Sequence, residues 1–267
     1  MKMSALVSFV LFVVLGVGAL TAVAADETTV GAAAGLSDPR TLFLFLSCVF
    51  FAATLYFGTF KFFQKRNLIL CAEWAVMAIS VTNLSIWVFT QQQWQFDFSM
   101  YLDAFSRVAG MNLLVVFGFL AVTHNYKPSV LTDVFILLAI GVIAAILMYV
   151  DYMDPVRPFV FFAIYFMFLP FLMLLTWKLF AMGNRVLGVH MIITTLLFTY
   201  IHSIADFYPI PGDATNVLYN YGFMALTFWA YGYLVIYFAY VGLERHSVRS
   251  SVSGREHPTH SDRFVAR

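Results

Sequence analysis

Residues 130–150 read VLTDVFILLAIGVIAAILMYV, an apolar run with a single charged residue, Asp133. An α-helix rises about 1.5 Å per residue, so roughly twenty apolar residues are needed to cross the ~30 Å hydrocarbon core of a bilayer. This stretch has the required length and composition, and it therefore predicts a transmembrane helix.

Further stretches of the same kind lie on both sides of it, near residues 41–63, 67–89, 100–123, 157–180, 186–208 and 216–241. The chain is 62% hydrophobic and only 11% charged, which is too apolar for a single globular core that must stay dissolved in water. We therefore expect an all-α membrane protein, a seven-transmembrane helix bundle over residues 41–241. Its partner is then the lipid bilayer, and we expect no nucleic acid; a homo-oligomer or a membrane-complex partner stays open.

The N-terminal segment has the three parts of a secretory signal peptide. Lys2 supplies a positive charge, residues 5–20 are apolar, and Ala22-Val23-Ala24 is a small-residue cleavage site. We predict that residues 1–24 are cleaved and that residues 25–40 form an extracytoplasmic leader. The alternative is an uncleaved eighth helix.

The loops between the expected helices divide by charge. Residues 61–66, 124–127 and 178–185 are basic, while the other connections hold Asp97, Asp151, Asp154 and Asp213. By the positive-inside rule the basic side is cytoplasmic, which gives an N-out, C-in topology in a bacterial inner (plasma) membrane. Residues 242–267 are polar and arginine-rich, so we expect a disordered cytoplasmic tail, in which His257 and His260 are too few to define a metal site.

Ionisable side chains at membrane depth are costly unless they are paired or wetted, and they often mark function. Asp103 and Arg107 are one helical turn apart, and His202 and Asp206 repeat that spacing. All four are expected in the outer half of the membrane, where they would form one polar cluster. An architectural ion pair, or a metal site of His202, Asp206 and Asp103, is the alternative.

Two more ionisable residues, Glu73 and His190, are expected nearer the inner surface as a secondary inner pair, or as an interfacial carboxylate and a hydrogen-bonded histidine. In the last expected helix, Tyr233, Tyr237 and Tyr240 form one helical stripe. Such a stripe is more often a packing surface than a cofactor pocket.

Short motifs give the chain a resemblance to the microbial rhodopsins, especially the proteorhodopsin type. Met100-Tyr101-Leu102-Asp103 resembles the family's Arg-Tyr-x-Asp, and the resemblance places Asp103 at the position of the chromophore counterion. Tyr208-Pro209 and Leu218-Tyr219-Asn220 resemble the end of the family's sixth helix and the start of its seventh.

The chain also departs from that family at the residue that matters most. The family binds retinal through a lysine of the last helix, and no lysine occurs between Tyr219 and Val241. The lysine position corresponds to Thr227 or to Tyr231. Met100 replaces the motif's arginine, and no carboxylate lies near Leu114. The resemblance therefore implies an opsin-like protein without covalent retinal, and not a light-driven proton pump.

We accordingly favour a sensor or interaction scaffold over an enzyme, with the outer cluster as its site and its cofactor unknown. A metal-binding membrane enzyme or electron-transfer subunit is the first alternative. A membrane anchor subunit of a larger complex is the second.

Overall fold

The computed structural model describes residues 39–90, 92–124, 129–204, 207 and 225–256, and the regular structure in these ranges is entirely helical. The α-helices are α2 (Pro39–Gln64), α3 (Leu68–Thr90), α4 (Gln93–Phe105), α5 (Val115–Thr123), α6 (Val130–Tyr149), α7 (Arg157–Ala181), α8 (Arg185–Ile204) and α9 (Leu226–Glu256). A π-helix, η2 (Ser106–Leu114), joins α4 to α5, and a short 3₁₀ turn, η3 (Asp151–Met153), follows α6.

Six of the described helices, α2, α3, α6, α7, α8 and α9, are long and apolar enough to cross a membrane. The all-helical, multi-span class expected from the sequence is thus confirmed. The segments Gln93–Val108 and Asn112–Ala121 pass the same test only when they are taken together, with a bend of 44° between them.

This bent segment differs from the sequence prediction of one helix over residues 100–123. The helix begins earlier, at Gln93, and its middle is the π-helix η2. A π-helix bonds residue i to i+5 instead of i+4, and such stretches are rare and often found at functional sites. Apolar periodicity could not reveal it, because a hydropathy pattern does not specify which hydrogen bonds the backbone makes.

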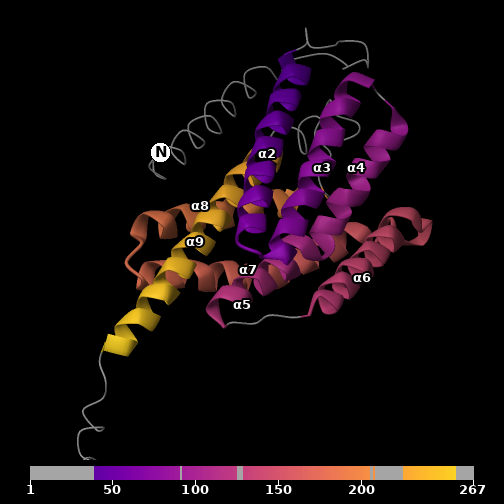
Figure 1. Ribbon diagram of the computed structural model, residues 1–267. Coiled ribbons are helices and arrows are strands. Elements are labelled where there is room, and N and C mark those ends of the chain that lie inside the picture. The colour runs from indigo at the N-terminus through magenta and orange to yellow at the C-terminus, as the bar shows by residue number, and fades with distance from the viewer. Residues whose placement is uncertain (1–38, 91, 125–128, 205–206, 208–224, 257–267) are drawn as a thin grey trace, which may run out of the picture.

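Helix α9 is the most enclosed candidate span: 78% of its most apolar window is buried, against 17% for α6. It packs against α2, α5, α7 and α8, whereas α6 contacts mainly α4. In Figure 1, α2, α3 and α4 lie side by side and α6 lies at the edge of the molecule. Apolar side chains on the outside of α6, such as Leu131 and Phe135, suit contact with lipid.

The tyrosine stripe of α9 is a packing surface, as the sequence predicts. Tyr233 packs edge-on against Trp74 and Phe51, and Tyr240 packs against Phe62. Close approach to this aromatic layer requires a glycine in α2, because a Cβ atom added at Gly58 would lie 2.1 Å from Trp74 Cδ1. The layer therefore fixes α2, α3 and α9 against each other.

At the basic end of the bundle, α9 is tied to the turn after α2. Lys65 forms an ion pair with Glu244, and Asn67 donates a hydrogen bond from Nδ2 to the Tyr240 hydroxyl over 3.2 Å. Helix α9 then continues to Glu256, so helical structure extends into residues 242–256, where the sequence predicted a disordered tail.

Several predictions concern residues outside the described ranges. These are the signal peptide at 1–24, nearly all of the leader at 25–40, Asp206, the motifs at 208–209 and 218–220, and the two tail histidines His257 and His260.

Candidate functional site

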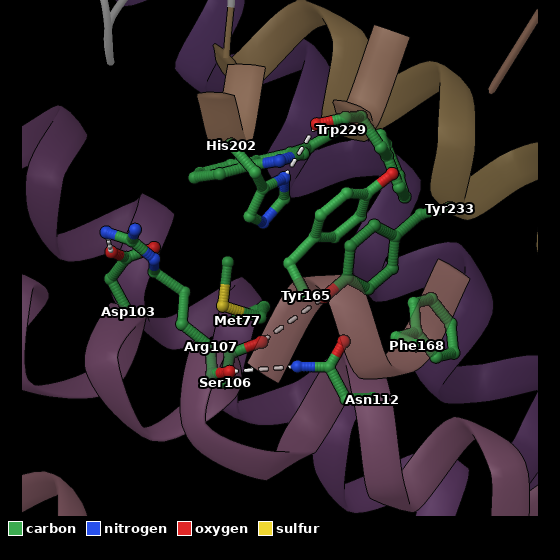
Figure 2. Close-up of a pocket in the computed structure, with 11 residues that line it drawn as sticks. Met77, Asp103, Ser106, Arg107, Asn112, Tyr165, Phe168, His202, Trp229 and Tyr233 are labelled. Carbon is green, nitrogen blue, oxygen red and sulfur yellow. Dashed lines mark hydrogen bonds and ion pairs between the residues drawn. The ribbon is translucent and has the colours of Figure 1, made fainter. Parts of the chain in front are cut away.

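A small internal cavity lies where α3, α4, η2, α7, α8 and α9 meet. The volume that the centre of a water-sized sphere can occupy inside it is about 20 Å³. This is room for about one water molecule. Figure 2 shows the side chains converging on it. The lining residues are Met77, Asp103, Ser106, Arg107, Asn112, Tyr165, Phe168, Phe198, His202, Trp229 and Tyr233.

One wall of the cavity is an ion pair within a single helical turn. Arg107 Nη1 lies 3.8 Å from Asp103 Oδ2, and the side chains are only 9% and 11% exposed. The guanidinium also lies over the Phe161 ring, 4.0 Å from its centre, in a cation–π contact. The pair thus holds two opposite charges in a poorly solvated position. Removal of either charge would leave the other without the partner that stabilises it.

The opposite wall is aromatic and contains His202. Its imidazole lies flat on the Tyr165 ring, with 4.2 Å between ring centres and 11° between planes, and the Trp229 ring is 6.4 Å away. His202 Nδ1 is 2.8 Å from the Phe198 carbonyl oxygen. Because a carbonyl can only accept, Nδ1 must carry the hydrogen, and a further proton would bind at Nε2.

Three of the four residues of the expected outer cluster therefore share one cavity: Asp103, Arg107 and His202. The fourth, Asp206, lies outside the described residues. Among the residues that the structure describes, no group of three or more His, Cys, Asp or Glu side chains is arranged to hold a metal ion. A metal site of His202, Asp206 and Asp103 remains a prediction because Asp206 is not among them.

Glu73 and His190, expected either as an inner pair or as an interfacial carboxylate and a hydrogen-bonded histidine, have separate hydrogen-bond partners in the structure. Glu73 is completely buried and accepts hydrogen bonds at Oε1 from the Ser106 hydroxyl and, over 3.0 Å, from the Tyr233 hydroxyl. His190 instead places Nδ1 2.8 Å from the Tyr231 hydroxyl. Glu73 lies close to the start of α3, and this position suggested a carboxylate at the membrane interface. The carboxyl group is instead enclosed, because η2 and α9 cover this face of α3.

Glu73 adjoins the cavity through its partners, because Ser106 and Tyr233 both line it. Its second oxygen, Oε2, is buried and has no hydrogen-bond partner among the described residues. Burial of a carboxyl oxygen without a hydrogen-bond partner costs folding free energy. Packing alone therefore does not explain why a glutamate occupies this position.

Thr227 and Tyr231, to which the resemblance to microbial rhodopsins would assign the retinal-binding lysine, do not line the cavity. Thr227 is buried, with Oγ1 3.5 Å from Ser47 Oγ, and Tyr231 is bonded to His190. Their neighbours on α9, Trp229 and Tyr233, reach the cavity instead.

Sequence reasoning missed Ser106, Tyr165 and Trp229 as lining residues. Their side chains are ordinary in a membrane helix, and only the packing of η2, α7 and α9 brings them together. The one available signal was that Ser106 directly precedes Arg107.

No family model, curated protein or solved structure matches the chain.

Proposed function

We propose that the chain is an opsin-like membrane sensor without covalent retinal, and that its input acts on the cavity between Asp103, Arg107 and His202. The observation that carries the proposal is the placement of a buried ion pair and a histidine around one small cavity. Polar groups of this kind inside a membrane bundle are expensive and are usually kept for a function.

The size of the cavity favours a very small input. Pockets for drug-sized ligands measure about 300–1,000 Å³, whereas this one has room for about one water molecule. A proton or a water-sized molecule fits the described conformation, and a large ligand would require the helices to separate. Histidine is the side chain whose charge changes near neutral pH, so a proton is the input we favour.

Protonation of His202 would act on groups from every wall of the cavity. A charge on its ring would face Tyr165 of α7 and Trp229 of α9, and also Asp103 and Arg107. It would attract the carboxylate and repel the guanidinium, which weakens the existing pair. Since Arg107 belongs to η2, we expect this π-helical segment to be the element that responds.

The proposal includes the topology expected from the sequence. Counting the bent segment of α4, η2 and α5 as one span gives seven, and an odd number places the two ends of the bundle on opposite sides. The basic loops then favour an N-out, C-in orientation in a bacterial plasma membrane, after removal of residues 1–24.

Tryptophan fluorescence of the purified protein in lipid nanodiscs tests the proposal, because Trp229 lies near His202. The difference between the wild type and Trp229→Phe isolates the contribution of Trp229. We expect this contribution to change with pH in a single step and the step to vanish in His202→Gln.

The matched control is His190→Gln, which removes a histidine of the same helix that is bonded to Tyr231 and does not line the cavity. This variant should keep the step. A step that survives in His202→Gln, or no step in the wild type between pH 5 and 8, would contradict the proposal.

A further inference from the structure

A second feature lies at the basic end of the bundle, between α5, α7 and α9. Two adjoining hollows there share the lining residues Thr123, Lys178 and Leu243. The volumes that the centre of a water-sized sphere can occupy in them are about 170 and 350 Å³. Together they form a groove, which we call the α5–α7–α9 groove. It is far roomier than the internal cavity and shares no lining residue with it.

The inner part of the groove is apolar. It is lined by the side chains Val116, Phe119, Leu120, Phe171, Leu174 and Leu175. These residues belong to α5 and to the second half of α7, so this part runs from the helix ends toward the middle of the candidate spans. An apolar hollow at membrane depth is suited to hydrocarbon and not to a water-soluble anion.

The outer part carries positive or protonatable nitrogen. Lys178 lies in the last turn of α7 and lines both hollows, while His124 borders one and His246 the other. His246 and His124 are exposed. No aspartate or glutamate is among the residues that line either hollow. Glu244, the sequence neighbour of the lining residue Leu243, forms an ion pair with Lys65.

We propose that the α5–α7–α9 groove binds one anionic phospholipid, with an acyl chain along Leu174 and Phe171 and the phosphate beside Lys178. An amphiphile with a hydrocarbon chain and an anionic head matches both halves of the groove, the apolar inner part and the basic outer part. Basic pockets between membrane helices bind anionic head groups in this way, and lysine serves there as a point charge for phosphate. The inference requires that the bundle spans a membrane, but it does not depend on the proposed sensing by His202.

Native mass spectrometry of the full chain in a mild detergent tests this inference, with phosphatidylglycerol and phosphatidylcholine of equal chain length as probes. The wild type should retain one phosphatidylglycerol in preference to phosphatidylcholine. Lys178→Gln should weaken phosphatidylglycerol binding by about fivefold, the change expected for one lysine near a phosphate, and should leave phosphatidylcholine unaffected. Lys178→Arg should restore the preference.

Two matched variants locate the lipid. Lys61→Gln removes a lysine from the same basic end that does not line the groove, and it should bind phosphatidylglycerol like the wild type. Leu174→Trp should fill the apolar part and reduce retention of the lipid although Lys178 is intact. Leu174 is 49% exposed, so the larger ring does not have to enter a packed core.

Three results would overturn the inference. Equal losses in Lys178→Gln and Lys61→Gln would show a diffuse attraction of anionic lipid to the whole basic end. Binding of inorganic phosphate that competes with the lipid, together with unchanged retention in Leu174→Trp, would show a simple anion site. Equal retention of the two phospholipids by the wild type would show no head-group selection.

Discussion

The Tyr233 hydroxyl donates a hydrogen bond to Glu73 Oε1 over 3.0 Å, across 160 positions of the sequence. The same oxygen accepts from Ser106, so one fully buried carboxyl group joins α3, η2 and α9. These contacts adjoin the internal cavity, because Ser106 and Tyr233 also line it. The position of η2 relative to α9 therefore depends on polar contacts as well as on apolar packing.

Tyr233→Phe should destabilise the protein by about 1–3 kcal/mol, because it removes a donor from a buried acceptor without changing the ring. Thermal unfolding in detergent measures the effect. Tyr237→Phe is the control, since it removes a hydroxyl from the same stripe one turn away and does not affect Glu73. A loss no larger than that of the control would mean that the hydrogen bond contributes little.

Arg107→Met should cost about 3–5 kcal/mol, because it leaves Asp103 in a poorly solvated place without its cation. Asp103→Asn should relieve part of that loss when the two changes are combined. A thermal-stability cycle of the two single variants and the double variant gives the coupling free energy. Strict additivity would show that the residues are independent, and the pair would then not be a functional unit.

Gly58→Ala should destabilise the bundle by about 1–3 kcal/mol through overpacking, since the new methyl group would lie 2.1 Å from the buried ring of Trp74. Gly242→Ala is the matched change in α9, where the nearest atom is 3.8 Å from the added Cβ. It should be neutral or stabilising by up to about 1 kcal/mol, because alanine is the better helix former. Equal thermal stability of the two variants would contradict the close packing of α2 on α3.

Retinal added to the purified protein should give no visible absorption band that hydroxylamine bleaches, because an imine requires an amine and α9 offers no lysine up to Val241. The absorption spectrum with and without retinal is the measurement. Thr227→Lys and Tyr231→Lys are the converse variants. A band in the wild type would disprove the retinal-free assignment, and a band in either variant would support opsin ancestry.

A reporter fused after Arg267 should be cytoplasmic, and the mature protein should begin near Ala25. Both follow from the basic loops and from the signal-peptide pattern. Protease accessibility in intact cells and N-terminal sequencing check them. Labelling of the C-terminus from outside intact cells would reverse the topology.

Composition and hydropathy were enough to predict the helical class and the approximate positions of α2, α3, α6, α7 and α8. The prediction for 157–180 agrees with α7 at Arg157–Ala181, and that for 130–150 agrees with α6 at Val130–Tyr149. Such boundaries are predictable because the hydrocarbon thickness sets the length of an apolar helix.

Side-chain partners could be predicted only when they were local. The pairing of Asp103 with Arg107 follows from a spacing of four residues. The partners of Glu73 do not, because Ser106 and Tyr233 come from two other elements whose rotation and tilt no periodicity reveals. Distance from a helix end was a poor guide to burial, since it says nothing about which neighbours cover a face.

The π-helix η2 has a consequence for the whole of the third candidate span. Because each π turn holds more residues than an α turn, side chains after Leu114 are displaced around the axis from the directions that an unbroken α-helix would give them. The span thus has two helical phases. In the part before the π-helix, Asp103 lines the cavity. In the part after it, Phe119 packs against Tyr240. One continuous segment therefore serves two interfaces, the cavity before Leu114 and the aromatic contact with α9 after it.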